Sequence, residues 1–331
     1  MRFGPVPLAL AEGAILAHSG ALPQGRLRKG CHLGPNELAA LEAAGLTRVT
    51  VARLDPGDMH EDAAALAVAR ALVPDPDKAG LRLAPVGTGR VNLHATAPGI
   101  AEVLADRVQA LNAVDPMITL ATVVPWQRLA EGEMAATVKI IAYAVPSTSV
   151  AKAAEAGAGA LRLCPARLRT AVLVETQLSP RTRELGIQPI ANRLAALGVA
   201  LSAHLRCPHD TQALAATLTG LPPADLVLIL TASATSDPQD VAPAAVRGAG
   251  GSIERFGMPV DPGNLLFLGR LGATPVIGLP GCVRSPALNG ADWVLERVIC
   301  GIPVTGADIA AMGVGGLLKE IPQRGRLREA K

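Results

Sequence analysis

Hydrophobic and polar positions follow two kinds of periodicity in the second half of the chain. From about residue 168, short apolar runs at 170–174, 199–205 and 225–231 are each followed by a helical pattern, at about 181–197, 211–218 and 239–249. Continuous apolar runs bounded in this way are typical of strands that are buried on both faces of a parallel sheet. The pattern therefore predicts an α/β unit whose mostly parallel sheet carries helices on both faces.

Two further apolar runs, at 265–268 and 275–279, are separated by a glycine-containing stretch, which predicts a hairpin with a glycine turn. The second run ends in Leu279-Pro280-Gly281, and a helix is predicted from about Asn289 to Cys300. A glycine here allows the backbone to approach a ligand, and free amides favour an anion. Ligands of parallel sheets bind beyond the carboxyl ends of the strands. We therefore expect a site where segments 175–177, 231–240 and 278–285 converge.

The first half of the chain mixes helical and extended patterns. A helix is predicted to begin at Pro35 and to end at Gly45, ahead of a strand at 49–51. Further along, the pattern predicts a helix at 60–73, a strand pair at 81–96, a helix at 98–113, extended runs at 118–124 and 137–145, and an alanine-rich link at 149–160. The predicted division is a segment 1–54 with a helix and a strand, an α+β domain 55–165, an α/β domain 168–320 and a tail 321–331.

Composition excludes several classes of protein. With 331 residues and 50% hydrophobic content, the chain can bury a large core and is not disordered. A net charge of +3, without basic runs, argues against nucleic acid as a partner. No stretch reaches the roughly 18 to 20 apolar residues that a membrane span needs. Five cysteines without CxxC spacing suit a reducing compartment and argue against disulfides, so we expect a cytoplasmic protein.

Two smaller clusters have competing interpretations. Gly87-Thr88-Gly89-Arg90 is a glycine loop with one cation, which either holds a phosphate or forms a plain turn, and the lone motif favours the turn. His204, Cys207 and His209 have the residue types of a metal site. Strand alternation, however, points His204 and Cys207 to opposite faces, so we predict no metal there.

Three stretches carry a resemblance to a known family. They are DPGNLLFLGRLGATPVIGLPG at 261–281, PQDVAPAA at 238–245, and RKGCHLGPNELAALEAAGLTRVTV at 28–51. These resemble, respectively, a KPGKP…GLPGNP.S run, a PRDVTPEA-like helix start, and an upstream stretch of the molybdopterin-binding proteins of molybdenum cofactor biosynthesis. The chain is most similar to a divergent molybdopterin molybdenumtransferase, with about 115 residues between the upstream stretch and the first strand of the predicted α/β domain. The resemblance implies a molybdopterin-binding fold for that domain.

The resemblance assigns roles to particular residues. Asp240 matches an acidic residue of the metal and nucleotide step, which implies a catalytic role and Mg²⁺ binding, although aspartate also favours a helix N-cap for its own sake. Gly278, Pro280 and Gly281 match the pterin-phosphate loop, and Ser285 matches the loop serine. From the matched and converging segments, the expected cofactor-binding residues are Glu175, Thr176, Thr231, Ser233, Asp261, Gly263, Pro280, Gly281, Arg284 and Ser285.

The chain also departs from the family pattern. Residues 231–236 replace a Gly-Gly pair, Asp261 and Asn264 stand where the family has lysines, and Cys282 replaces an asparagine. These exchanges remove cationic donors for a phosphorylated pterin or molybdate, and Arg284 restores one.

The resemblance thus implies a molybdopterin-binding protein that, if active, inserts molybdate into adenylated molybdopterin, with molybdopterin as cofactor and Mg²⁺ and molybdate as further ligands. The alternative is a non-catalytic carrier of molybdopterin, or its nucleotide form, for a cytidylyltransferase or a molybdoenzyme. A nucleotide-pyrophosphate hydrolase is a third hypothesis. The expected partners are the pterin and, as in the resembled families, further copies of the chain.

Overall fold

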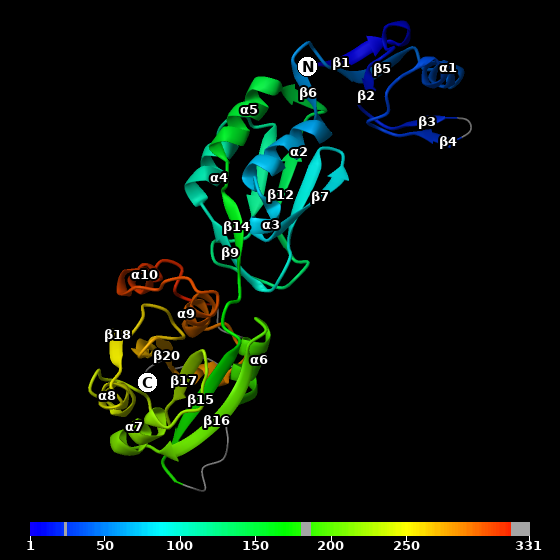
Figure 1. The fold of residues 1–331 in the computed structure, drawn as a ribbon. Helices are drawn as coiled ribbons and strands as arrows, with labels where there is room; N and C mark the ends of the chain where they lie inside the picture. The colour runs from blue at the N-terminus through cyan, green and yellow to red at the C-terminus, as the bar shows by residue number, and fades with distance from the viewer. Residues whose placement is uncertain (23–24, 180–186, 319–331) are drawn as a thin grey trace, which may run out of the picture. The chain divides into compact units, whose positions relative to one another are not determined.

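The computed structural model describes residues 1–22, 25–179 and 187–318 (Figure 1). Contacts between residues divide the chain into two compact units, one formed by 1–97 and 101–163, the other by 98–100 and 164–331. The predicted tail at 321–331 and the start of the helix predicted at 181–197 lie outside the described residues. None of the described helices is long and apolar enough to cross a membrane.

The first unit begins with a small antiparallel sheet. Strands β1 (Arg2–Pro7), β5 (Arg48–Arg53) and β2 (Ile15–Leu16) form it in the order β1-β5-β2, next to helix α1 (Pro35–Ala43) and the hairpin β3 (Gly20–Leu22) and β4 (Gly25–Leu27). Leu16, Leu33, Leu41 and Val51 are buried in its core. The predicted helix and strand of segment 1–54 are therefore present.

The rest of this unit packs helices on a four-stranded antiparallel sheet. The sheet has the order β10 (Ile118–Thr122), β12 (Met134–Ile140), β8 (Arg90–Ala95) and β7 (Leu81–Gly87). Its helices are α2 (Glu61–Leu72), α3 (Pro76–Ala79), α4 (Ala105–Asn112) and α5 (Ser147–Ala156). Two smaller sheets have the order β11 (Arg128–Leu129), β9 (Gly99–Val103), β14 (Leu161–Pro165), and β13 (Ala144–Pro146), β6 (Asp58–His60).

Two predictions for this region are wrong. Residues 99–103 form strand β9, not the start of a helix, and only 105–112 are helical. The alanine-rich stretch 149–160 is not a link, because most of it belongs to α5, whose Val150 and Ala153 are buried in the core of the unit. In both places burial in the core of the unit, which local composition does not reveal, decides the outcome.

The second unit is a mixed α/β structure around a six-stranded, mostly parallel sheet. Its order is β16 (Ala200–Pro208), β15 (Thr170–Gln177), β17 (Leu226–Leu230), β20 (Thr274–Leu279), β19 (Phe267–Leu271) and β18 (Ser252–Phe256). The first four strands are parallel, and β19 pairs antiparallel with both β20 and β18. The prediction of a mostly parallel sheet is confirmed.

Helices cover both faces of this sheet. Helices α7 (Thr211–Thr219) and α8 (Val241–Gly248) pack on Val172, Val174 and Val227. Leu173 and Leu228, which alternate with those residues and are fully buried, face the opposite side. On that side lie α6 (Ile187–Ala195) and α9 (Gly290–Ile299), joined by an ion pair. Helix α10 (Gly306–Ala311) follows.

The hairpin β19–β20 is present, but its turn is shorter than predicted. Leu271 pairs with Thr274, so Gly272 and Ala273 form the turn, and Gly272 has φ +59°. Gly269, expected in the turn, lies inside β19, where an added β-carbon would be 2.4 Å from Ser252 O. That glycine is needed for the close approach of β18 and does not mark a turn.

Candidate functional site

Three predicted segments meet at the carboxyl edge of the six-stranded sheet. Glu175 and Thr176 end β15, Thr231 follows β17, and Pro280 follows β20. Because β15, β17 and β20 are parallel neighbours, these residues come to the same edge. The expected convergence of the segments is therefore present.

The loop after β20 begins with a turn of 3₁₀ helix, η2 (Gly281–Arg284). Its first closing bond runs from Val283 N to Pro280 O at 3.0 Å, so the amides of Gly281 and Cys282 precede the hydrogen-bonded ladder of the turn. Gly281 is exposed, and a β-carbon there would have only Arg284 Nη1, at 3.6 Å, within contact range. The loop can therefore admit a ligand at Gly281.

Gly278 has a different role from Gly281. A β-carbon on Gly278 would lie 1.9 Å from the ring of Phe267, which is buried in the core. This glycine makes room for an aromatic ring within the sheet, and its part of the matched motif is explained by packing.

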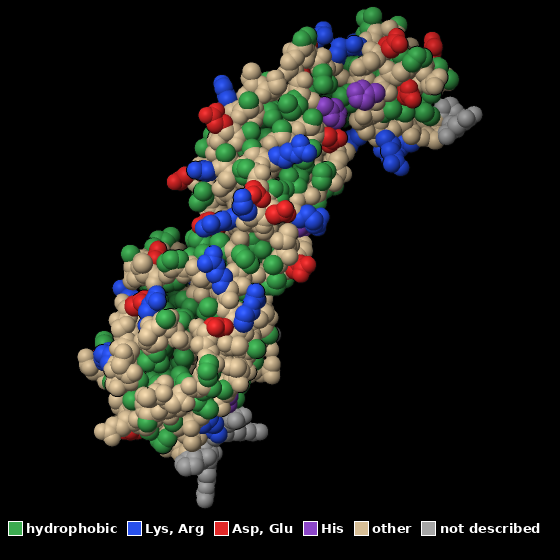
Figure 2. All heavy atoms as spheres, in the orientation of Figure 1, with side chains coloured by type: hydrophobic (Ala, Val, Ile, Leu, Met, Phe, Trp, Pro, Cys, Tyr) green, Lys and Arg blue, Asp and Glu red, His purple; other side chains and the backbone are tan. Residues whose placement is uncertain are grey.

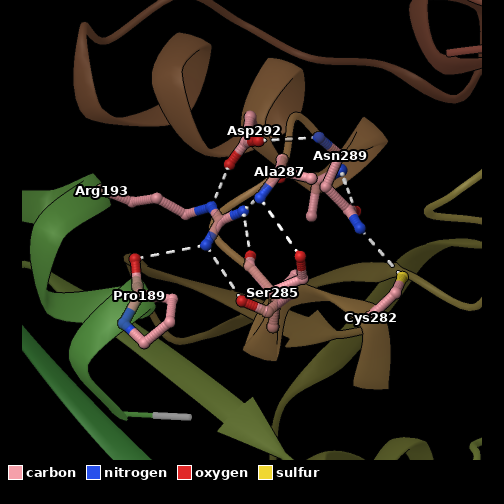
Figure 3. A network of polar contacts seen from close by, with 9 residues as sticks. Pro189, Arg193, Cys282, Ser285, Ala287, Asn289 and Asp292 are labelled. Carbon is pink, nitrogen blue, oxygen red and sulfur yellow. Dashed lines mark hydrogen bonds and ion pairs between the residues drawn. The ribbon is translucent and has the colours of Figure 1, made fainter. Parts of the chain in front are cut away.

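A buried arginine on α6 holds the loop in shape (Figure 3). The Arg193 side chain is 10% exposed and pairs with Asp292 at the start of α9. Its guanidinium also donates to carbonyl oxygens of the loop at 2.8 to 3.0 Å, those of Val283, Ser285 and Ala287. A guanidinium has five donors in a rigid fork, so one residue can bind this many acceptors. Sequence reasoning missed Arg193, although its position next to Leu194 on an amphipathic helix is a usable signal.

Cys282, the residue in place of the family's asparagine, contacts the helix that follows. Asn289 Nδ2 donates to Cys282 Sγ at 2.9 Å, and Asn289 Oδ1 accepts from Ala291 N at 3.0 Å (Figure 3). Asn289 therefore caps α9 and holds the Cys282 side chain at once. Ser285 contributes its carbonyl to Arg193, and its hydroxyl accepts from Ala287 N at 3.3 Å.

Glu175 is the centre of an ionic cluster at this edge. Its carboxylate lies 3.3 Å from His204 Nε2, 3.6 Å from Arg206 Nε and 3.8 Å from Arg284 Nη2. The same Arg284 nitrogen is 3.4 Å from Thr231 O. Of these residues, sequence reasoning predicted Glu175, Arg284 and Thr231. His204 and Arg206 were missed as partners, although strand alternation places both on one face of β16.

The hydroxyl residues near the edge hold the loop after β17. Thr176 Oγ1 accepts from Ala232 N at 2.9 Å and bonds His209 Nδ1 at 2.9 Å. Thr231 Oγ1 donates to Ser233 O at 2.6 Å, and the Ser233 side chain is exposed. The side chains of Thr231 and Thr176 therefore bond the backbone of the loop that replaces Gly-Gly.

Asp240 caps helix α8. One carboxylate oxygen accepts from Val241 N at 2.7 Å, and the other accepts from Ser236 N at 3.1 Å. Both oxygens thus bind backbone amides, which fits the N-cap interpretation of this half-buried residue. Among the described residues, no group of three or more His, Cys, Asp or Glu side chains could hold a metal ion. A Mg²⁺ at Asp240 would therefore take its other ligands from water and from the phosphate oxygens of a bound nucleotide.

The KPG-like segment joins the sheet to the end of the described chain. Asp261 pairs through its backbone with residues 316–318, with Asp261 N 2.8 Å from Gly316 O. Gly263 has φ +143°, and a β-carbon on it would lie 2.9 Å from the Gly290 backbone. Gly263 is therefore required by packing, while the Asp261 side chain is exposed.

His204 and Cys207 lie on opposite faces of β16, as strand alternation predicts, and His209 follows the strand. His204 faces Glu175, whereas His209 bonds Thr176. Cys207 is buried in the core that includes α7, and burial raises the pKa of its thiol.

No protein-family model and no curated protein sequence matches the chain. Among solved structures, it is similar to a molybdopterin biosynthesis MoeA protein from Pyrococcus horikoshii, with 13% identity, 93% of this chain and 75% of that chain covered, and a TM-score of 0.30. It is also similar to a molybdenum cofactor biosynthesis protein from Pyrococcus furiosus, with 11% identity, 94% and 65% covered, and a TM-score of 0.25. Likenesses this weak do not show a family or an activity.

Proposed function

We propose that the second unit binds molybdopterin, or its nucleotide-linked form, at the carboxyl edge of its sheet and acts in molybdenum cofactor biosynthesis. The observation that carries the proposal is the loop at Gly281, where a β-carbon would meet only Arg284 Nη1, at 3.6 Å, and two amides precede the hydrogen-bonded ladder of η2. Arg284 in the same loop supplies a positive charge. Together they suit a phosphate on a planar ligand that must approach the backbone closely.

The residues of this edge divide the work of binding. Gly281 and Cys282 offer amides to the phosphate, Arg284 offers its guanidinium, and Arg193 keeps the loop in the required shape. When bound, molybdopterin supplies the dithiolene on which molybdenum chemistry takes place. Asp240 would add a carboxylate to a Mg²⁺ that a nucleotide phosphate also binds.

The same geometry supports two activities that differ in turnover. A molybdenumtransferase would insert molybdate into the adenylated ligand, whereas a carrier would bind the pterin and pass it on. The carrier is favoured by the position of Asp240, whose oxygens both accept backbone bonds, and by Asp261 and Asn264 in place of lysines.

Calorimetry with molybdopterin tests the binding proposal. Gly281→Val should weaken binding at least about tenfold, because the added side chain occupies the approach to the amides. Gly306→Val is the matched control, since a β-carbon there would meet only Arg255 Cδ at 3.8 Å. Equal affinities of the two variants, with both folded, would remove the loop from the site.

Turnover separates the transferase from the carrier. Incubation with adenylated molybdopterin, Mg²⁺ and molybdate should form molybdenum cofactor if the protein is a transferase, and leave the ligand bound but unchanged if it is a carrier. Asp240→Asn can keep the N-cap bond from Val241 N, although its amide nitrogen cannot accept from Ser236 N as the second carboxylate oxygen does. Loss of turnover in this folded variant would place Asp240 in the reaction, and undiminished turnover would leave it as a cap.

A further inference from the structure

Four side chains from two strands and a loop form what we call the Glu175 cluster: Glu175, His204, Arg206 and Arg284. Strand pairing explains their meeting, because Glu175 pairs with Arg206 across β15 and β16, and His204 lies two residues earlier on the same face. Arg284 reaches them from the loop after β20. The cluster therefore lies at the carboxyl edge, where ligands of parallel sheets bind.

The cluster contains more positive than negative groups. Two guanidiniums and an imidazole surround a single carboxylate, at 3.3 to 3.8 Å. These contacts are longer than charge-assisted hydrogen bonds, which are about 2.7 to 2.9 Å. The carboxylate is 6% exposed, whereas the Arg206 and Arg284 side chains are 26% and 28% exposed. The cations thus lie nearer to solvent than the anion behind them.

We propose that the Glu175 cluster binds a doubly charged tetrahedral oxyanion, a phosphate or the phosphate end of a larger ligand, between Arg206 and Arg284. Guanidinium forks match the oxygens of a phosphoryl group, and two of them on one side favour a dianion over a monoanion. Glu175 orients both guanidiniums from behind. The site shares Arg284 with the proposed pterin site and adds His204 and Arg206 of β16, which the pterin proposal does not use.

The test is a titration of the full chain with inorganic phosphate at low ionic strength, followed by ³¹P NMR or calorimetry. Arg206→Gln should weaken phosphate binding about tenfold, because it removes one charged donor pair. Arg270→Gln is the matched control, since Arg270 forms an exposed ion pair with Glu254 on β18 of the same sheet. Glu175→Gln should tighten binding several-fold, because a negative charge is removed beside the bound anion.

The site is supported if Arg206→Gln weakens binding, Glu175→Gln tightens it and Arg270→Gln does neither. Adenosine monophosphate then identifies the source: tighter binding than inorganic phosphate indicates a nucleotide, and equal binding indicates a phosphate without one. The proposal is overturned if Arg206→Gln and Arg270→Gln bind phosphate equally, or if folded Glu175→Gln binds it more weakly. If Glu175→Gln does not fold, the comparison of Arg206→Gln with Arg270→Gln decides the test by itself. Phosphate binding without pterin binding would refute the pterin proposal only. Pterin binding without phosphate binding would refute the proposed oxyanion site of the Glu175 cluster.

Discussion

Two glycine loops of this protein, Gly87–Arg90 in the first unit and the loop at Gly281 in the second, have opposite uses for their backbone amides. In the first, Gly89 N donates to Asp62 Oδ1 at 2.6 Å, so a carboxylate of the protein already occupies the position that a phosphate would take. A β-carbon on Gly89 would lie 2.9 Å from Ile140 O, whereas one on Gly281 would meet only Arg284 Nη1, at an ordinary contact distance of 3.6 Å. Both loops contain glycine, and packing fills the first loop while it leaves the second open at Gly281.

The largest expected effect concerns how the Gly281 loop keeps its shape. Arg193→Met should lower the free energy of unfolding by about 3 to 5 kcal/mol, because it leaves Asp292 buried without its cation and several loop carbonyls without their donor. Urea denaturation measures the loss. Arg270→Met, at an exposed ion pair, should cost less than about 1 kcal/mol. Similar losses in both variants would show that the loop does not depend on Arg193.

The next largest effect concerns the loop Gly87–Arg90, in which the Gly89 amide already donates to Asp62. Gly89→Ala should destabilise the protein by about 2 to 3 kcal/mol, since Gly89 has φ +70° and the new methyl group would collide with Ile140 O and Glu61. Gly87→Ala is the matched control, because Gly87 has φ +85° and nothing within 4 Å of an added β-carbon. Its cost should be that of the backbone strain alone, about 1 kcal/mol. Equal costs in thermal or urea unfolding would mean that Gly89 is not tightly packed.

Asp225 is a third carboxylate that accepts hydrogen bonds from backbone amides, and its contribution to stability should depend on pH. Hydrogen bonds from Arg169 N at 2.8 Å and Thr170 N at 2.9 Å, with the Thr170 hydroxyl, lower the pKa of Asp225. A lowered folded-state pKa contributes stability above the unfolded pKa of about 3.9, and this contribution is lost as the pH falls through the folded-state pKa. Asp225→Asn should therefore be less stable than the parent at pH 7, by less than Gly89→Ala.

The pH dependence supplies the check on Asp225. Unfolding curves from pH 7 down to about pH 2 should show the difference between parent and Asp225→Asn shrinking below about pH 4, as the carboxyl protonates. A difference that stays constant over this range would indicate that the charge of Asp225 is not what the two amides stabilise.

The smallest effect on stability is expected at Gly281, where a substitution should instead lower the affinity for the proposed ligand. Gly281→Ala should change the free energy of unfolding by less than about 0.5 kcal/mol, because its β-carbon meets only Arg284 Nη1 at contact distance. Molybdopterin affinity should nevertheless fall by several-fold, as measured by calorimetry. A stability loss comparable to that of Gly89→Ala would remove the contrast between the two loops.

Much of the fold could be predicted from the sequence. Continuous apolar runs alternating with helical patterns specified the parallel part of the second unit's sheet, because a strand buried on both faces must be apolar throughout. The glycine and proline residues at the ends of the apolar runs located the hairpin at 267–279 and the loop at Gly281. Failures came where burial competed with local composition, as at β9 and in the alanine-rich α5.

Only part of the candidate site could likewise be predicted from the sequence. The sequence by itself determined that Glu175, Thr231 and the loop at Gly281 would meet at one edge, since the carboxyl ends of parallel neighbours are adjacent. Only the tertiary structure decided which glycines are packed and which are open, that both oxygens of Asp240 accept backbone amides, and that Arg193, His204 and Arg206 join the edge. Those outcomes depend on distances between side chains far apart in the chain, and no local pattern encodes these distances.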